Sequence, residues 1–239
     1  MAAEALFAPL REAPSLSGLV FDVDGTLAPI VPRPELAAVP EETRSQLRRL
    51  AAVYLLVACV SGRTGEDAHR LVGVEKITYV GNHGLELHPR AHELRGRIAR
   101  FRTAVGLPTE DKGLSLSYHY RQAADEAVTR AQLEAVAERA RAEGLDARWG
   151  RKVLEIRPTV EADKGTAVRS LLERSGARRA LYAGDDTTDL DAFAGLLAVG
   201  LEHAVRVAVA SEEGPPELAQ TADLVVADPE ELAELLRRL

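Results

Sequence analysis

Two aspartates stand two positions apart where a short apolar run ends, a spacing that lets both carboxylates serve one small site. Asp22 and Asp24 follow the apolar residues 19–21 and precede Gly25 and Thr26. A carboxylate in this place can attack phosphorus, while a second one donates and accepts the protons of the reaction. Gly25 allows a sharp turn that brings N–H groups close to an anion. The alternative is an acidic turn, although a solvated turn does not need two acids directly after a buried strand.

A hydroxyl group and an ammonium group occupy two further junctions between predicted elements. Ser61 follows the apolar run 54–60 and can donate to a phosphoryl oxygen, with the N–H groups of Gly62 and Arg63 as additional donors. Ser61 can equally cap the helix that follows. Lys164 stands at the start of another predicted helix, where it can lower the repulsion between an anionic nucleophile and an anionic substrate. A solvent-exposed lysine is the alternative, but a cation at a helix N-terminus is unfavourable without a compensating anion.

Three aspartates crowd the segment that follows the apolar run 180–183. Asp185, Asp186 and Asp189 offer hard oxygen ligands, and this density suits Mg²⁺, which takes one or two carboxylates and keeps several waters. Asp185 is the ligand we predict. Asp186 and Asp189 are expected to hold metal-bound water or to orient Lys164. The alternative for Asp189 is a cap on the helix that follows it.

The elements that must position these groups follow from hydrophobic periodicity. Short apolar runs alternate with amphipathic stretches, which predicts a parallel sheet covered by helices on both faces. In such sheets ligands bind beyond the carboxyl ends of the strands, so the polar groups above should gather at one edge. The predicted strands are 19–21, 54–60, 77–80, 180–183, 205–209 and 224–226, and the predicted helices are 41–52, 65–72, 164–173, 190–196 and 230–239.

The middle of the chain predicts a second domain at residues 88–158, inserted into an α/β domain formed by residues 1–87 and 159–239. Residues 114–121 alternate between apolar and polar side chains, as in a strand of an antiparallel sheet. The further elements predicted here are a helix at 123–142 and strands at 146–149 and 152–156.

One face of the inserted sheet is expected to be polar. The side chains placed on or beside it are Glu110, Lys112, His119, Arg121, Arg151, Glu155 and Arg157. Carboxylates and cations together can bind the hydroxyl groups of a sugar in fixed directions. The alternative for each of these residues is the ordinary solvated face of a half-buried sheet.

The four clusters resemble, in order and position, the signature motifs of the haloacid-dehalogenase (HAD) superfamily. They are DVDGT at 22–26, the strand-end Ser61, Lys164, and GDDTTD at 184–189. The resemblance implies an α/β fold: a Rossmann-like HAD core, with helices on both faces of a parallel sheet, and an inserted α+β cap domain of the C2 type. It also implies a phosphatase.

The same resemblance implies roles for individual residues. Asp22 forms an aspartyl phosphate and Asp24 moves the protons. Mg²⁺ is held by Asp22, Asp185 and the carbonyl oxygen of Asp24. Ser61 and Lys164 neutralise the remaining phosphoryl oxygens.

Several stretches are similar to a narrower group, the trehalose-6-phosphate phosphatase family. They are GNHGLE at 81–86, EDKG at 110–113, SYHYR at 117–121, VLEIRP at 153–158 and GDDTTDLDAF at 184–193. This resemblance spans nearly the whole chain and implies trehalose 6-phosphate as substrate, supplied by a trehalose-phosphate synthase. One departure is Leu190, where the family pattern has an acidic residue. The substrate contacts expected are Gly25, Thr26, Gly62, Arg63, Asn82, His83, Glu110, Lys112, Arg121 and Glu155, with His119 and Arg151 in addition.

Composition excludes several other classes of protein. A net charge of −7 and 4% aromatic residues argue against nucleic acid as the main partner. No apolar run approaches the roughly 20 residues of a membrane-spanning helix. The first residues lack the pattern of a signal peptide, so we expect a cytoplasmic protein. Cys59, the one cysteine, lies in an apolar run and is expected to be buried rather than reactive.

Three alternatives remain open from the sequence. The first is a phosphatase of the same mechanism for sucrose phosphate, for mannosyl- or glucosyl-phosphoglycerate, or for a generic hexose phosphate. The second is a regulatory module that binds a sugar phosphate without catalysis, although Asp22, Asp24, Lys164 and Asp185 are all present. A phosphoryl-transferring mutase is the third, and no second phosphate site is evident for it.

Overall fold

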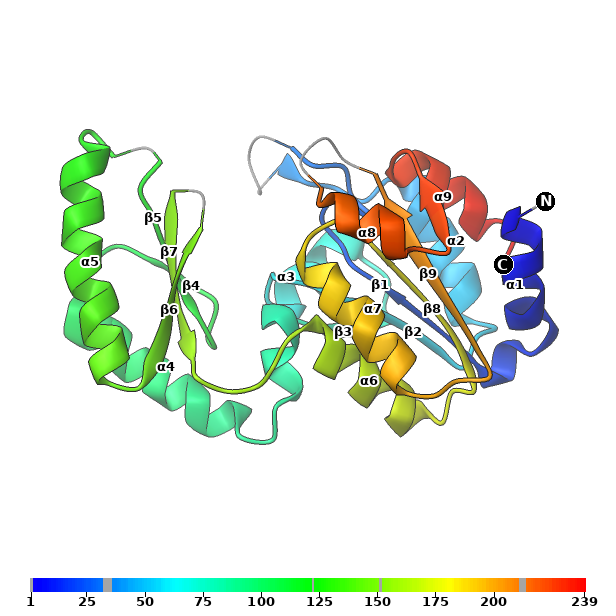
Figure 1. The fold of residues 1–239 in the computed structure, drawn as a ribbon, viewed down its shortest axis with the longest axis horizontal. Coiled ribbons are helices and arrows are strands. Elements are labelled where there is room, and N and C mark those ends of the chain that lie inside the picture. Colours follow the sequence, from blue (N-terminus) through cyan, green and yellow to red (C-terminus); the bar gives the residue numbers. More distant parts are fainter. Residues whose placement is uncertain (1, 32–35, 122, 151, 211–213) are drawn as a thin grey trace. The chain divides into compact units, whose positions relative to one another are not determined.

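The computed structural model describes residues 2–31, 36–121, 123–150, 152–210 and 214–239. The chain divides into two compact units (Figure 1), one formed by Met1–Gly84 with Ala162–Leu239 and the other by Leu85–Glu161. Each boundary lies a few residues from the one expected above. Among the helices of the described ranges, none is long and apolar enough to cross a membrane.

The first unit is built on a six-stranded parallel sheet in the order β10-β9-β8-β1-β2-β3 (Figure 1). Every residue of the central strand β1 is buried, which is why its sequence is a continuous apolar run rather than an alternation. Because all the strands are parallel, their carboxyl ends lie at one edge of the sheet. The strands are β1 (Ser17–Phe21), β2 (Leu56–Val60), β3 (Thr78–Val80), β8 (Arg179–Gly184), β9 (His203–Val209) and β10 (Leu224–Val226).

Helices cover both faces of this sheet (Figure 1). The larger hydrophobic core includes apolar residues of α1 (Ala2–Glu12), α2 (Glu41–Ala51), α3 (Gly65–Val72) and α9 (Pro229–Leu236) on one face. The opposite face is covered by α6 (Lys164–Ser175) and α7 (Thr188–Ala198), with the short α8 (Pro216–Thr221) beside α7. Gly18 of β1 lets α6 approach, because a Cβ atom there would lie 2.7 Å from Leu172. Two short 3-10 segments, η1 (Pro14–Leu16) and η3 (Asn82–Leu87), complete the described elements.

The second unit contains a four-stranded antiparallel sheet in the order β4-β5-β7-β6. The core of this unit lies on one face of the sheet, where Leu116, Tyr118, Leu154 and Ile156 pack with residues of both helices, Phe101 among them. The opposite face is therefore the one that can carry polar side chains. The strands are β4 (Glu110–Asp111), β5 (Leu116–His119), β6 (Leu145–Gly150) and β7 (Val153–Pro158), and the helices are α4 (Ala91–Val105) and α5 (Glu126–Ala142).

The predicted α/β core with an α+β insertion is confirmed, with corrections in detail. The sequence pattern predicts no helix at α1, α4 or α8. The alternation at 114–121 places Ser115 and Ser117 on the polar strand face, and the structure buries both of them, at 2% and 3% exposure. The buried position expected for Cys59 is confirmed, and burial raises the pKa of its thiol.

Candidate active site

Three neighbouring strands of the first unit carry the predicted polar groups to one edge. Asp22 directly follows β1, Ser61 follows β2, and Asp185 follows β8. Since β1 lies between β2 and β8, these residues are brought together by the order of the strands in the sheet. Backbone hydrogen bonds hold the ends in register: Asp22 N donates to Ala183 O at 2.9 Å, and Ser61 N donates to Val80 O at 2.9 Å.

Lys164 is buried between two carboxylates rather than exposed to solvent. Its Nζ atom lies 2.8 Å from Asp22 Oδ1 and 2.6 Å from Asp189 Oδ1. The residue is the first of α6, whose start is fixed by reciprocal bonds between Asp163 and Thr166. Burial alone would lower the pKa of Lys164, but the two carboxylates raise it, so the ammonium form is held. A cation at a helix N-terminus is unfavourable without compensating anions, and the carboxylates of Asp22 and Asp189 provide them here.

The carboxylate of Asp189 accepts hydrogen bonds from four neighbouring groups. Its Oδ1 atom accepts from Lys164 Nζ and from Tyr182 Oη, each at 2.6 Å. Its Oδ2 atom accepts from the backbone N–H groups of Asp185 and Asp186, each at 2.9 Å. A carboxylate offers about four acceptor positions, and these bonds fill them. Asp189 thus contacts Lys164, as the expected role of orienting that lysine requires. The alternative of a cap on α7 is wrong, because the bonded N–H groups precede that helix.

Asp185 is placed by two small neighbours from the loop after β1. Thr26 Oγ1 donates to Asp185 Oδ1 at 3.0 Å. Gly25 has a φ of +86°, and a Cβ atom at this position would collide with the Asp185 carboxylate. Glycine is therefore required there both for the turn and for the close approach. In this structure Gly25 and Thr26 support an acidic side chain.

The charges of this site fit a divalent cation. Oxygen atoms of Asp22, Asp185 and Asp189 all lie within 4.8 Å of one another, and all three residues are buried. Burial raises the pKa of Asp22 well above its usual range, against the opposing effect of Lys164. Burial and then the charge of Asp189 raise the pKa of Asp185 to about 6. Hard oxygen donors with excess negative charge are what Mg²⁺ requires. Because Asp189 has its acceptor positions filled, Asp22 and Asp185 are the carboxylates left to bind it.

The side chains of Asp24 and Arg63 form a bidentate ion pair. Arg63 Nε donates to Asp24 Oδ2 at 2.7 Å and Arg63 Nη2 donates to Asp24 Oδ1 at 2.6 Å. Both side chains are partly exposed. Arg63 was predicted to contact substrate, and the pairing with Asp24 was not foreseen.

The loop after β2 lies against the residues that follow β3. Ser61 Oγ accepts from the N–H of Arg63 at 3.1 Å, and the alternative of a helix cap is wrong because Thr64 caps α3. Asn82 N donates to Arg63 O, and His83 N donates to Ser61 O. A Cβ atom on residue 62 would lie 2.7 Å from the His83 ring. Asn82 and His83 both have positive φ, a strained conformation that is concentrated at functional sites.

Two predicted sugar contacts of the second unit, Glu110 and Glu155, lie on one sheet face, opposite its core. The pairing aligns Glu110 with Ser117, Ser117 with Glu155, and Glu155 with Arg148, so that one row of side chains crosses the sheet. His119 Nε2 lies 2.8 Å from Glu110 Oε2. Arg148 was not predicted, because its place in the row depends on strand register.

Two other predicted contacts of this unit, Lys112 and Arg121, lie outside that row. Lys112 Nζ is 4.0 Å from Glu110 Oε2. Arg121 is exposed beyond the end of β5. Arg151 lies outside the described residues.

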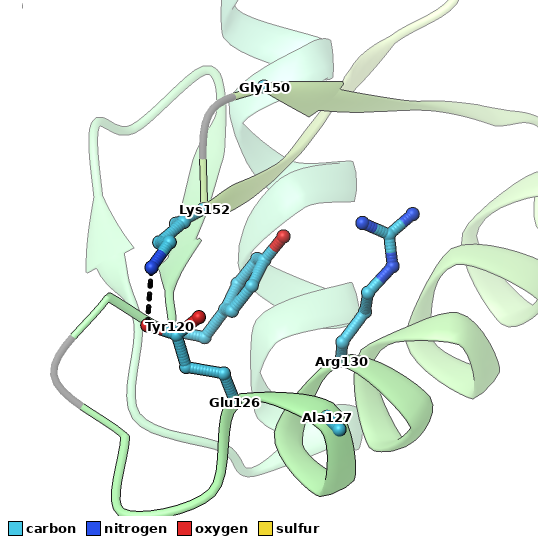
Figure 2. A pocket seen from close by; sticks show the side chains of 6 residues that line it. All are labelled: Tyr120, Glu126, Ala127, Arg130, Gly150 and Lys152. Carbon is cyan, nitrogen blue, oxygen red and sulfur yellow. Dashed lines mark hydrogen bonds and ion pairs between the residues drawn. The ribbon is translucent and has the colours of Figure 1, made fainter.

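A separate cavity of about 520 Å³ opens on the helix side of the second unit (Figure 2). Figure 2 shows the ring of Tyr120 between Lys152 and Arg130, with Lys152 Nζ paired to Glu126 Oε1 at 2.6 Å. Arg130 also lies over the Trp149 ring, 4.8 Å from its centre. None of the predicted sugar contacts in the described chain lines this cavity.

Comparison with known proteins identifies the family. The sequence pattern of trehalose-phosphatase matches residues 20–96 and 100–230. The chain belongs to the trehalose-phosphatase family. Trehalose 6-phosphate phosphatase RA3 of Zea mays is 32% identical over 98% of this chain and 73% of its own length. Trehalose-phosphate phosphatase of Mycobacterium avium is 36% identical over 72% of this chain.

Solved structures agree with this trehalose-phosphatase assignment. The crystal structure of a trehalose-6-phosphate phosphatase related protein matches with a TM-score of 0.71 at 26% identity, covering 92% of this chain and 96% of that one. A haloacid dehalogenase-like hydrolase from Bacteroides thetaiotaomicron shares the fold, with a TM-score of 0.59 at 16% identity, covering 93% of this chain and 98% of that one. The predicted resemblance to trehalose-6-phosphate phosphatase is confirmed, and the fold implied by the haloacid-dehalogenase resemblance is shared.

Some of the proteins that this chain resembles are much longer than it. The chain spans 49% of the Mycobacterium avium protein. It spans 16% of two Mycobacterium tuberculosis proteins described as uncharacterised glycosyl hydrolases.

Proposed function

We propose that the protein hydrolyses trehalose 6-phosphate to trehalose and phosphate through an aspartyl phosphate on Asp22. The observation that carries this proposal is the buried group formed by Asp22, Lys164, Asp185 and Asp189 at the carboxyl edge of the parallel sheet. The chain that forms this sheet belongs to the trehalose-phosphatase family. An ammonium group 2.8 Å from Asp22 Oδ1 lowers the repulsion between the carboxylate and an anionic phosphate. We place the reaction in the cytoplasm, after a trehalose-phosphate synthase.

In the proposed reaction, Asp22 attacks phosphorus while Lys164 and Ser61 bind phosphoryl oxygens. Asp24 protonates the departing sugar oxygen and then takes a proton from the water that hydrolyses the acyl phosphate. Arg63 holds both carboxylate oxygens of Asp24 in this structure, so Asp24 must exchange this partner before it donates a proton.

Mg²⁺ is the cofactor we propose, held by the carboxylates of Asp22 and Asp185 and by the carbonyl oxygen of Asp24. When bound, Mg²⁺ supplies positive charge that draws a phosphoryl group toward Asp22. The row from Glu110 to Arg148 and its neighbours Lys112, His119 and Arg121 are proposed to bind sugar hydroxyls. Residues 88–158 would thus be a cap domain that sets specificity.

A panel of phosphate esters tests the substrate. With Mg²⁺ present, kcat/KM for trehalose 6-phosphate should exceed that for glucose 6-phosphate by at least about ten-fold, because a monosaccharide leaves polar groups of the site unpaired. The panel includes sucrose phosphate and the glucosyl- and mannosyl-phosphoglycerates. Equal turnover of glucose 6-phosphate, or preference for another ester, would reject trehalose 6-phosphate.

The Asp22→Asn variant tests the nucleophile. It should lose about 10³-fold or more in kcat while remaining folded, because the amide oxygen cannot attack phosphorus effectively. Asp223→Asn, which alters an aspartate paired with Arg206 at the β9–β10 edge, serves as the control. Full activity of Asp22→Asn would remove the nucleophile from the mechanism.

A further inference from the structure

Tyr182 is a buried residue of β8 for which the proposed reaction gives no role. Its hydroxyl donates to Asp189 Oδ1 at 2.6 Å, and neither residue is exposed. The ring packs edge-on against Phe193 of α7, with centroids 6.1 Å apart. Phenylalanine could make that ring contact equally well, so the hydroxyl is not needed for packing.

The hydroxyl lies at the end of a continuous chain of polar contacts. Asp189 Oδ1 accepts from both Tyr182 Oη and Lys164 Nζ, and Lys164 Nζ also contacts Asp22 Oδ1. A buried carboxylate keeps one orientation only when donors fix it. The backbone N–H groups of residues 185 and 186 hold Oδ2, whereas Oδ1 has the hydroxyl as its second donor. Without it, Oδ1 is left to the flexible lysine alone.

We infer that Tyr182 is a positioning residue for the nucleophile. It fixes Asp189, which fixes the ammonium of Lys164 against Asp22. The inference rests on the proposed function, because the geometry it maintains is that of phosphoryl transfer. A small displacement of the ammonium would weaken the stabilisation of charge as the phosphoryl group moves. The effect should therefore fall on the chemical step more than on binding of the sugar.

A pair of tyrosine variants separates positioning from stability. Tyr182→Phe removes a buried hydroxyl that bonds to Asp189. Tyr54→Phe removes one that donates to the backbone oxygen of Leu239 at 3.0 Å, outside the site. Both variants lose one hydrogen bond of a buried tyrosine, so both should show a similar, modest drop in melting temperature. The expected result is a loss of about ten-fold in kcat for Tyr182→Phe with KM within about two-fold, and a change within about two-fold for Tyr54→Phe.

A second measurement does not depend on activity. The chain has only four lysines, Lys76, Lys112, Lys152 and Lys164, so ¹⁵N NMR of lysine ammonium groups gives few signals. The buried Lys164 ammonium should give a protected signal in the metal-free protein. Tyr182→Phe should shift this signal or broaden it through faster hydrogen exchange, while Tyr54→Phe should leave it in place.

The outcomes are distinct. An unchanged Lys164 signal in Tyr182→Phe, or a kcat loss no larger than that of Tyr54→Phe, would overturn the role of Tyr182. A wild-type protein without turnover of trehalose 6-phosphate would reject the proposed function, while the NMR comparison would still test whether Tyr182 fixes Lys164.

Discussion

The site of this protein buries several charged side chains together, which is electrostatically unfavourable and which folding alone does not require. Asp22, Asp185 and Asp189 are buried together, and Lys164 faces two of them. Removing several like charges from water is unfavourable unless other charges compensate. Burial and Asp189 raise the pKa of Asp185 to about 6, which expresses that cost. Such local conflicts are expected at functional sites.

The raised pKa of Asp185 leads to a prediction for the metal-free protein. Because the folded protein holds the Asp185 proton more tightly than the unfolded chain does, protonated Asp185 contributes to the free energy of unfolding. This contribution is complete at pH values below the ordinary pKa of 3.8 and is lost as the pH rises through about 6. Asp185→Asn keeps a neutral side chain throughout. Near pH 7 in a chelator, its free energy of unfolding should therefore exceed that of the wild type by up to about 3 kcal/mol, and the difference should shrink near pH 4. Urea denaturation at both pH values measures it.

Added Mg²⁺ provides the control for this prediction. It should raise the melting temperature of the wild type, because a ligand of the folded state stabilises it, and should do so much less for Asp185→Asn. A variant less stable than the wild type at neutral pH would contradict the argument.

At this scale the main candidate residues of the site can be predicted from the sequence, but not all of their hydrogen-bond and ion-pair partners can. Asp22, Lys164 and Asp185 were predictable because each follows an apolar run or begins a helix. The pair Arg63–Asp24 and the bond from Tyr182 were not, since they join residues 39 and 7 positions apart through the fold. No period in the sequence encodes such contacts.

At the scale of elements, the first turn of helix α6 determines where the Lys164 side chain lies. Asp163 caps α6 by accepting from Thr166 N, and Thr166 returns a bond to the backbone of Asp163. Lys164 is the next residue. The orientation of the first turn of α6 therefore sets where the ammonium group emerges.

Two capping aspartates allow this coupling to be tested. Asp228 caps α9 by accepting from Glu231 N, as Asp163 does for α6. Each change to alanine should lower the free energy of unfolding by about 1 kcal/mol. Only Asp163→Ala should also lower kcat severalfold, because only that cap precedes Lys164. Equal kcat values for the two variants would show that loss of the α6 cap does not displace the Lys164 ammonium group, which contradicts the prediction.

The sequence pattern does not predict helices α4 and α1, and each omission has a physical reason. In α4, Leu94, Ile98 and Phe101 form a narrow buried stripe among many arginines, which obscures the helical period. In α1, Pro9 lies inside the helix and argues against one by propensity. The parallel strands were easier to predict because burial on both faces makes them continuous apolar runs.

Over the whole molecule, chemistry and substrate recognition are proposed to fall to different units. Glu155 lies in the polar row of the second unit, whereas Glu126 pairs with Lys152 on the helix side of that unit. Glu155→Ala should lower kcat/KM for trehalose 6-phosphate by about ten-fold or more, as expected for a lost charged hydrogen bond. Its effect on a small aryl phosphate should stay within about two-fold.

Glu126→Ala is the matched control, and neither substrate should respond to it. Equal losses on both substrates for Glu155→Ala would mean that Glu155 supports the fold and does not bind the sugar.

The insertion also has a consequence for biosynthesis. β1 carries Asp22 and pairs on one side with β2, but its other neighbour is β8, which is encoded after the whole second unit. During translation Asp22 therefore emerges before the second unit, directly after a strand that still has one edge unpaired. The contiguous residues 85–161 leave the ribosome next and can fold as a unit before the sheet closes. The nascent chain thus cannot bring Asp22, Lys164, Asp185 and Asp189 together until residues 179–189 have been made.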